Sequence, residues 1–532
     1  MFDLVISGGT VIDGTGAPGR RADLGIEAGR ITAIGDIGAA EAVERIDATD
    51  QVVAPGFVDL HSHSDLTLLS APGAPNKIHQ GITTEVNGNC GMGGVPLPAG
   101  QAVAIRRANA TIDPDLGVDW SWSGFASYRD TLEGMGIALN TAPLVGHIPL
   151  RVTVAGDAAR PLDAQERAGL VRELEAALDA GAVGFSTGLM FPPAMSADRE
   201  ELIEIGRAVA RHDALFAAHF RNYSDHLLEG VDEILDVARQ SRCRLQVSHL
   251  AVAGRRNWGK VPQALEKIDR ARAEGLDVAA DIYPYIAGSA NLSQLLPGWA
   301  QDGGSVAITE RLGREADRTR ILRDWETELF FGWDEVEVAS LEPGMEETLG
   351  LTVEAVGGIW GIDPPLAALE LIRRSENRVV MVAYGRSEDD LRAVLGYDAT
   401  SIGSDGLAMD PDGPSGAGRP HPRNYGCYPR FLGRYVRDQG VVSLEQAIEM
   451  STSRPAARAG LADRGRLAEG FAADVVVFDP ATIVDRSTFQ EPGLYPVGVA
   501  HVLVGGVPVI RDGTAVDGAR PGWVLTSSRE RR

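Results

Sequence analysis

Apolar and polar positions alternate at both ends of the chain, between turns that contain glycine. The alternation runs through residues 4–13, 24–34, 473–479 and 501–509. A period of two is typical of half-buried β-strands, and the glycine pairs mark hairpin turns. Neither end supplies enough strands for a stable sheet by itself. The pattern therefore predicts one small β-sandwich domain formed jointly by residues 1–54 and 466–532.

The middle of the chain alternates between short apolar runs and amphipathic helical patterns. Helices are predicted at residues 163–181, 198–211, 227–239 and 261–274, and the first begins with a capping box of Asp163 and Glu166. Strands are predicted near residues 58–60, 82–86, 142–145, 183–185, 215–218, 245–248, 278–281 and 399–403. Eight strands joined through helices predict an α/β protein with a (β/α)8 TIM-like barrel. A doubly wound sheet is the structural alternative.

One connection in this central region is unusually long. The stretch from about residue 290 to about residue 374 exceeds what a simple link between a strand and a helix requires. We therefore interpret it as an insertion that could cover the functional end of the barrel. On this interpretation the barrel domain occupies residues 55–465, between the two parts of the β-domain.

Composition narrows the classes of function. Of the 532 residues, 44% are hydrophobic and 23% charged, as in ordinary globular proteins, and no apolar run of about 18 residues could cross a bilayer. The net charge of -24 disfavours a nucleic-acid partner, which needs a basic surface. Three cysteines are too few for a disulfide framework, and the N-terminus lacks a secretory pattern. We expect a cytoplasmic protein without membrane or nucleic-acid partners, and the sequence leaves homo-oligomerisation open.

Side chains that can bind metal follow several of the predicted strands. His61 and His63 end the first strand and share one face, because side chains at i and i+2 of a strand point the same way. The others, each after a different strand, are Cys90, His219, His249 and Asp405. One such residue alone is more often structural, but all six fall at the same end of the predicted barrel. Mixed nitrogen and sulfur ligands favour zinc over magnesium or calcium.

Several motifs resemble the N-acyl-D-amino-acid deacylases, or D-aminoacylases, of the amidohydrolase superfamily. They include Gly88-Asn89-Cys90-Gly91, Gly146-His147, Ala218-His219-Phe220-Arg221, Ser248-His249, Asp281-Ile282-Tyr283-Pro284-Tyr285, Gly403-Ser404-Asp405-Gly406 and His421-Pro422-Arg423. The resemblance extends over nearly the whole chain. Cys90 takes the place of the carboxylated lysine that many other amidohydrolases use between metals.

The resemblance implies a metal-dependent reaction, in which the amide bond of an N-acyl-D-amino acid is hydrolysed to a carboxylate and a free D-amino acid. It implies one tightly bound zinc ion, held by Cys90, His219 and His249. It also implies a second, weaker metal position, formed by His61, His63 and Asp405. Asp405 would in addition act as the general base, which fits the need of amide hydrolysis for an activated water and a proton acceptor.

Recognition of the substrate carboxylate is where the chain departs from the family. The family commonly has a lysine two residues after the histidine of the sixth strand, and this chain has Ala251 there. The resemblance makes Arg423 the expected carboxylate anchor, through two parallel hydrogen bonds, with a hydroxyl from Tyr285. Arg221, Arg255 and Arg256 are candidates for replacing the missing lysine, each of them also interpretable as an ordinary paired or surface arginine.

Other assignments remain open at this stage. His147 matches the family and is either a residue behind the metal ligands or a packed core histidine. No metal role is assigned to His79, His212, His226, His421 and His501, nor to Cys243 and Cys427. The main alternative function is an amidohydrolase acting on a cyclic amide such as a hydantoin, lactam or imide, or on other N-acyl amino acids including L-forms. A non-catalytic binding protein is a weaker alternative, because no predicted ligand is missing.

Overall fold

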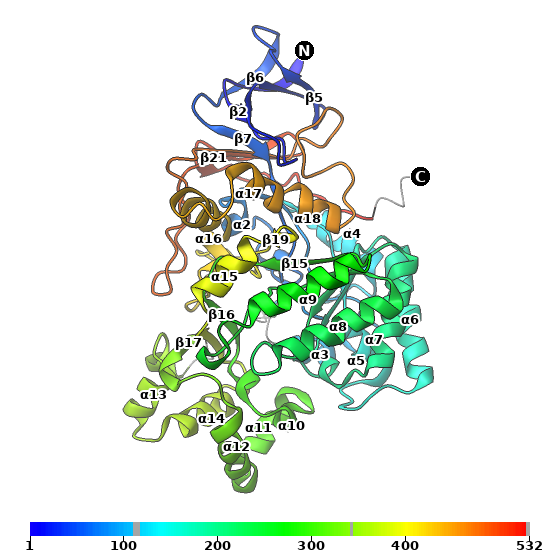
Figure 1. Cartoon of the computed structure of the whole chain (residues 1–532), viewed down its shortest axis with the longest axis vertical. Coiled ribbons are helices and arrows are strands. Elements are labelled where there is room, and N and C mark those ends of the chain that lie inside the picture. Colours follow the sequence, from blue (N-terminus) through cyan, green and yellow to red (C-terminus); the bar gives the residue numbers. More distant parts are fainter. Residues whose placement is uncertain (110–116, 341–343, 528–532) are drawn as a thin grey trace.

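Parallel strands surrounded by helices form the centre of the molecule in the computed structural model, which describes residues 1–109, 117–340 and 344–527 (Figure 1). One three-stranded sheet contains β10 (Asn140–Thr141), β9 (Ile82–Glu85) and β8 (Phe57–Asp59) in that order. A six-stranded sheet follows the order β11 (Leu144–Gly146), β12 (Gly184–Gly188), β13 (Leu215–His219), β14 (Arg244–Val247), β15 (Val278–Ile282) and β19 (Thr400–Ile402). Each of the predicted strand positions therefore carries a strand, and the fold is α/β.

Helices connect these strands where the amphipathic patterns predict them. The four predicted helices are α6 (Ala164–Asp179), α7 (Arg199–Arg211), α8 (Leu227–Ser241) and α9 (Val261–Ala273). The Asp163 carboxylate accepts hydrogen bonds from the backbone N–H groups of Gln165 and Glu166, and the Glu166 carboxylate accepts one from the Asp163 N–H, so the capping box is present. The remaining helices of the central region are α1 (Thr67–Ser70), α2 (Pro75–Ile78), α3 (Ala102–Ala108), α4 (Phe125–Met135), α5 (His147–Ala155), α15 (Glu388–Leu395), α16 (Arg423–Arg430), α17 (Leu444–Ser451) and α18 (Ser453–Arg458).

Both ends of the chain contribute to one seven-stranded sheet. In it β7 (Val52–Pro55) pairs antiparallel with β20 (Val475–Phe478), and Ala54 lies opposite Val476. The full order is β23 (Thr514–Ala515), β22 (Val507–Arg511), β21 (Val499–Val504), β20, β7, β2 (Thr10–Val11) and β3 (Arg20–Arg21). A four-stranded sheet has the order β5 (Arg30–Gly35), β4 (Asp23–Glu27), β1 (Phe2–Ser7) and β6 (Ala42–Asp47). Apolar residues of the two sheets, such as Leu4 and Val477, share one buried cluster.

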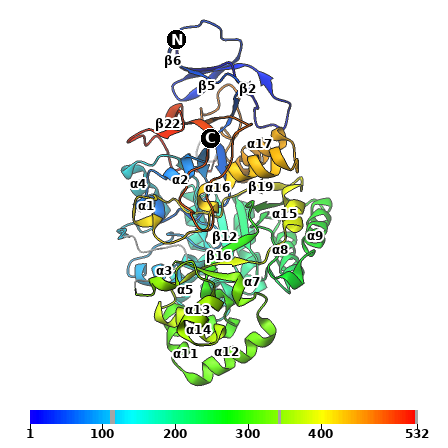
Figure 2. The same cartoon turned by 90° about the vertical axis from the view of Figure 1, so that its left-hand side faces the viewer.

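The predicted insertion forms a compact unit with its own core. Its sheet has the antiparallel order β16 (Ala287–Asn291), β18 (Val380–Tyr384) and β17 (Val336–Ser340). Its helices are α10 (Gly298–Gln301), α11 (Gly304–Leu312), α12 (Glu315–Glu328), α13 (Val353–Trp360) and α14 (Pro364–Arg374). The unit extends beyond the predicted limits of 290 and 374, from β16 to β18. The prediction missed these two strands because they are short and lack a clear alternation of apolar and polar residues. It lies at the end of the molecule opposite the terminal sheets (Figures 1 and 2).

None of the helices that the structure describes is by itself long and apolar enough to cross a membrane. Only α13 and α14 together would pass that test, and they are bent by 91° relative to each other.

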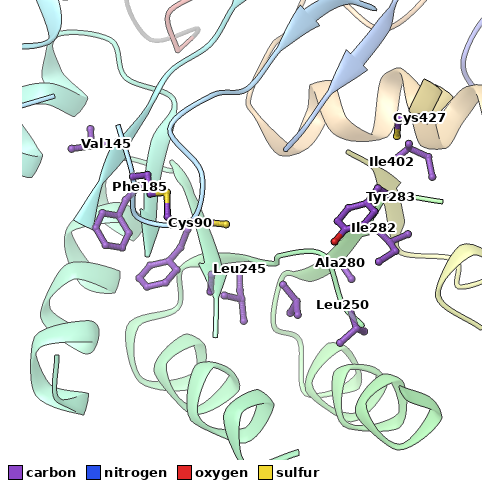
Figure 3. Packing of buried hydrophobic residues seen from close by; sticks show 14 of the residues in the cluster. Cys90, Val145, Phe185, Leu245, Leu250, Ala280, Ile282, Tyr283, Ile402 and Cys427 are labelled. Carbon is purple, nitrogen blue, oxygen red and sulfur yellow. The ribbon is translucent and has the colours of Figure 1, made fainter. Parts of the chain in front are cut away.

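Apolar side chains of the parallel strands make up the main core. In the view of Figure 3 this core extends from Val145 and Phe185 on one side to Ile402 on the other. Cys90 and Tyr283 lie between these groups, each just beyond the carboxyl end of a strand. The packed strands thus support a set of chemically reactive side chains at one end.

A buried network of charges joins the strands beneath that end. Lys77 is fully buried, and its ammonium donates hydrogen bonds to Asp59 Oδ2 at 2.8 Å and to Ser404 Oγ at 2.9 Å. The Glu85 carboxylate lies 3.4 Å from the same ammonium and accepts a hydrogen bond from Ser62 Oγ at 2.7 Å. Burial alone would lower the pKa of Lys77, but Asp59 and Glu85 raise it above its usual value.

We expect Lys77→Met to destabilise the metal-loaded protein by about 3–5 kcal/mol, because two buried carboxylates would lose their shared cation. The measurement is the free energy of unfolding, obtained from urea denaturation at neutral pH. Lys267→Met is the matched control, since Lys267 pairs with the exposed Asp232 and should contribute at most about 1 kcal/mol. Equal shifts in the two variants would contradict the role assigned to the buried network.

Candidate active site

The carboxyl ends of the parallel strands bring all six predicted ligand side chains together. His61 and His63 follow β8, Cys90 follows β9, His219 ends β13, His249 follows β14 and Asp405 follows β19. All six are buried, and they form two groups whose ligand atoms lie within 4.8 Å of one another. The first group is His61, His63, Cys90 and Asp405, and the second is Cys90, His219 and His249. Cys90 belongs to both groups and therefore stands between the two positions.

Distances in the second group match the edges of a metal coordination shell. Cys90 Sγ lies 3.4 Å from His249 Nε2, which lies 3.1 Å from His219 Nδ1. Tetrahedral zinc with bonds of about 2.0 Å to nitrogen places its nitrogen ligands about 3.3 Å apart. The residues present therefore fit a zinc ion with one ligand position left for water or substrate.

The first group includes the carboxylate. His61 Nε2 lies 3.3 Å from Cys90 Sγ and 3.5 Å from Asp405 Oδ1. His63 Nε2 lies 2.9 Å from the same oxygen. Its donor set of two imidazoles, a thiolate and a carboxylate also suits a divalent transition metal.

The electrostatics of the cluster favour a cation. Burial raises the pKa of the Cys90 thiol, but the imidazoles of His61, His249 and His219 together lower it well below its usual value. Burial likewise opposes protonation of His61, yet Cys90 and Asp281 raise the pKa of this imidazole well above its usual range. The cluster thus stabilises a thiolate and attracts positive charge, which is the environment that a metal ion requires.

A second carboxylate, Asp281, orients the His61 imidazole and holds the backbone of His249. Its Oδ1 accepts hydrogen bonds from His61 Nδ1 at 3.0 Å and from the backbone N–H of His249 at 2.7 Å. Donation from Nδ1 leaves the His61 Nε2 lone pair directed at the cluster. The sequence analysis did not assign a role to Asp281. Its position could have indicated a role, because Asp281 is a charged residue in an otherwise apolar strand, one residue before the end of β15.

Three of the six clustered residues have left-handed backbone conformations. The φ angles are 55° at Cys90, 33° at His249 and 51° at Asp405. Each such conformation costs a residue other than glycine about 1–3 kcal/mol, and such residues concentrate at functional sites. The surrounding structure compensates for this cost, for example through the hydrogen bond from the Asp405 N–H to the His61 carbonyl at 2.8 Å. The strand ends are therefore shaped to direct these side chains inward.

A cavity of about 560 Å³ opens onto the cluster and is walled on its far side by the insertion. Residues from all three strands of the insertion's sheet line it, including Ala290, Ala339 and Met381. Most of its walls are apolar. The cationic side chains in the lining are Arg378, Arg386 and Arg423. This combination suits a small organic substrate with an anionic group.

Arg423 reaches the cluster from the start of α16. Its Nη1 lies 2.6 Å from Asp405 Oδ2, and its guanidinium lies 4.7 Å from the centre of the Tyr283 ring. Burial raises the pKa of Asp405, but Arg423 and His63 lower it well below its usual value, so the carboxylate is ionised. His421 Nδ1 accepts a hydrogen bond from the Arg423 N–H at 3.0 Å and helps to hold the helix start.

The predicted tyrosine lies elsewhere. The Tyr285 hydroxyl donates to the Pro422 carbonyl at 3.3 Å, and the ring packs beneath the Arg430 guanidinium. Tyr285 is not part of the described cavity lining, whereas Tyr283 is. The reason is a tight turn, in which the Tyr285 N–H donates to the Tyr283 carbonyl and turns the chain away after the strand end. Tyr283 directly follows β15, and this position at a strand end could have indicated that Tyr283, and not Tyr285, lines the cavity.

Arg221 and His147 are also placed away from the described cavity lining. The Arg221 guanidinium pairs with Glu233 at 2.9 Å and donates to the Met195 carbonyl. His147 is enclosed between Thr187 and Glu201, each 2.8 Å from one ring nitrogen. The two residues thus have the hydrogen bonds and packing of structural side chains.

The other two candidate arginines are exposed at the surface. Arg255 pairs with Glu335 at 2.6 Å, and Arg256 pairs with Asp225. Ala251 is buried, so the position where the resemblance led us to expect a lysine carries no charge. None of the three arginines considered as replacements faces the described cavity.

Comparison with known proteins agrees with this geometry. The Amidohydrolase family model matches residues 44–292 and 400–510, which together exceed half of the chain and leave out most of the insertion. The N-acyl-D-glutamate deacylase of Alcaligenes xylosoxydans xylosoxydans is 40% identical over 98% of this chain and 96% of its own length.

Solved structures of similar proteins cover the full chain. The N-acyl-D-glutamate deacylase of Bordetella bronchiseptica, crystallised with zinc and a phosphonate inhibitor that mimics the tetrahedral intermediate, superposes with a TM-score of 0.83 at 36% identity, covering 99% of this chain and 100% of that one. A D-aminoacylase studied for its binuclear metal centre has the same TM-score and coverage at 34% identity. This chain therefore belongs to the N-acyl-D-amino-acid deacylase, or D-aminoacylase, family of the amidohydrolases.

Proposed function

We propose that this protein is a zinc-dependent amidohydrolase that converts an N-acyl-D-amino acid into a carboxylate and a free D-amino acid. The observation that carries the proposal is the meeting of six buried ligand side chains with the Arg423 guanidinium at one cavity. These nitrogen, sulfur and carboxylate ligands suit zinc, and the arginine suits a substrate carboxylate. The activities named for the similar proteins point to the same reaction.

The parallel strands are proposed to form one closed (β/α)8 barrel. Two connections between the three-stranded and six-stranded sheets support closure. The Leu144 N–H donates to the Asn87 carbonyl at 2.9 Å, and Ser62 and Gly406 form a parallel bridge. We propose the same domain limits as before, with the barrel at residues 55–465 and the β-sandwich formed by residues 1–54 and 466–532. Three buried, unpaired thiols support a reducing, cytoplasmic setting.

We assign the tight metal position to Cys90, His219 and His249, and a weaker second position to His61, His63 and Asp405. A bound zinc ion supplies Lewis-acid polarisation of the scissile carbonyl and lowers the pKa of water. Asp405 is ionised and belongs to the first group, which shares Cys90 with the second, so its carboxylate can accept a proton from water and deliver it to the leaving amine. Asp281 keeps His61 in the tautomer that the site requires.

A carboxylate on the substrate explains the buried guanidinium better than a neutral cyclic amide does. Arg423 pairs with Asp405, and a cyclic imide or hydantoin would bring no further anion to the cationic side of the largely apolar cavity. Assays of N-acetyl-D-amino acids, their L-enantiomers and cyclic amides with zinc-loaded enzyme test this choice directly. Turnover confined to cyclic amides would overturn the proposal, and turnover of L-enantiomers alone would overturn the stereochemical part.

Replacement of the shared thiolate tests the metal assignment. We expect Cys90→Ala to lose the tightly bound zinc and nearly all turnover, because the thiolate belongs to both ligand groups. Elemental analysis of the purified variant measures the zinc content. Cys243→Ala is the control, because Cys243 is a buried thiol whose pKa is raised to about 11 by burial and which lies outside both groups. Full zinc content in Cys90→Ala would show that Cys90 only packs in the core and does not bind the metal.

Removal of the proton acceptor tests the general base. Asp405→Asn keeps the size of the side chain, and asparagine tolerates the left-handed backbone at this position. We expect turnover to fall by at least about a hundredfold while the zinc at Cys90, His219 and His249 remains. Turnover and zinc content are measured on the same preparation. A variant that keeps most of its activity would exclude Asp405 as the base.

The carboxylate anchor is tested by changing the shape of the cation. Arg423→Lys keeps the charge but loses the planar pair of N–H donors. We expect kcat/KM to fall about tenfold or more, or about 1.4 kcal/mol, on an N-acetyl-D-amino acid. The matched substrate is the corresponding C-terminal amide, which lacks the charge. An equal loss on both substrates would mean that Arg423 supports the site without binding the carboxylate.

A further inference from the structure

The cavity contains a guanidinium that the proposed reaction does not yet use. Arg386 lines the cavity on the side of the insertion, and its Nη1 is buried with no hydrogen-bond partner among the residues that the structure describes. Within the same described residues no acidic side chain pairs with Arg386, whereas Arg423 pairs with Asp405. A buried cationic N–H group without an acceptor is unfavourable, so this position is suited to an anion supplied by a ligand.

The backbone around Arg386 is held on two sides. The Arg386 N–H donates to the Ile286 carbonyl at 3.2 Å, next to the start of the insertion. The preceding carbonyl, that of Gly385, accepts hydrogen bonds from the Gly254 N–H at 3.1 Å and from Trp258 Nε1 at 2.9 Å. These donors belong to the segment that follows β14 and His249. The insertion is thus joined to the metal-binding end of the strands immediately beside Arg386.

Small residues leave room for the guanidinium. A Cβ atom at Gly288 would come within 2.9 Å of Arg386 Nη2, so glycine at this place in β16 allows the side chain its observed position. Gly385 has a φ angle of 134°, which side-chain-bearing residues rarely adopt, and this turn directs the next residue toward the cavity. The position of Arg386 is therefore supported by its neighbours and is not that of a loose surface side chain.

Arg386 and Arg423 share one aromatic ring. Their Cζ atoms lie 4.9 Å and 4.7 Å from the centre of Tyr283. Besides its burial, the positive charges of both arginines lower the pKa of the adjacent His421 well below its usual value. Of these two guanidinium groups, only that of Arg423 pairs with a carboxylate among the described residues, which leaves the positive charge of Arg386 for a ligand.

We propose that Arg386 is a second carboxylate-binding cation of the active site, acting beside Arg423 across Tyr283. This inference rests on the proposed function and names an additional specificity residue for it. The carboxylate is either the α-carboxylate of the N-acyl amino acid or a second carboxylate on its side chain. In both cases the segment that follows the insertion's last strand, β18, supplies part of substrate recognition, whereas the ends of the parallel strands supply the metal ligands.

The test compares Arg386→Met with Arg255→Met, the same substitution at an exposed arginine of the neighbouring segment. Zinc-loaded enzymes are assayed for acetate release from N-acetyl-D-leucine, N-acetyl-D-glutamate and N-acetyl-D-leucinamide. We expect Arg386→Met to lose about tenfold or more in kcat/KM on the acids, mainly through KM, and little on the amide. Arg255→Met should match the wild type on all three. Arg386→Lys should recover part of the loss, and thermal unfolding with zinc analysis shows whether each variant is intact.

The outcomes separate the two proposals. Equal losses on leucine and glutamate derivatives support contact with the α-carboxylate, and a loss confined to the glutamate derivative supports contact with the side-chain carboxylate. An unchanged kcat/KM, or an equal loss on the amide, would overturn the role of Arg386 while the wild-type activity upholds the deacylase function. A wild type that releases acetate from none of the N-acyl-D-amino acids would overturn the proposed function, and the role of Arg386 with it.

Discussion

The hydrogen-bonded contact between the chain after β8 and the chain after β19 is the constraint on which the site depends. The Asp405 N–H donates to the His61 carbonyl, and the His63 N–H donates to the Gly406 carbonyl, at 2.8 and 2.9 Å. These two bonds place a carboxylate from late in the chain against two imidazoles from early in the chain. Lys77, buried directly beneath, holds Asp59 and Ser404 on the two sides of the same contact. Because these groups are buried, loss of the contact would leave charged side chains uncompensated.

The same region is assembled at a cost that a bound cation can offset. Three of the clustered residues have strained backbones, and the six buried ligand side chains bring their polar atoms together in two groups, each within 4.8 Å. A metal ion replaces the protons that the thiolate and the imidazoles would otherwise share. Its binding would therefore add to the stability of the folded state as well as to its chemistry. The structure is preorganised for the ion, with Asp281 fixing both His61 and His249.

The sequence places the six candidate ligand side chains at one end of the strands, and the structure brings them together there. A histidine, cysteine or aspartate at the end of a parallel strand, or a few residues after it, lies near the carboxyl end of the sheet. Residues for substrate recognition do not follow from such a rule. Tyr283 and Tyr285 stand two positions apart in one motif, and only the turn between them decides which one reaches the cavity. Arg221 looked suitable for the cavity, but its partner Glu233 lies on α8, twelve residues further along the chain.

Arg386 was beyond sequence reasoning for a related reason. It follows β18, the last strand of the insertion, and its position beside the strand ends depends on contacts between distant segments, such as Gly385 with Gly254. This separation has a physical consequence for how the enzyme is organised. Metal ligands are held by the strand ends and their buried charge network, so they tolerate little change. Part of the cavity wall, with Arg378, comes from a unit whose core is separate from that network, and Arg386 follows the last strand of this unit. Substrate preference can therefore change through the insertion while the hydrolytic chemistry stays the same.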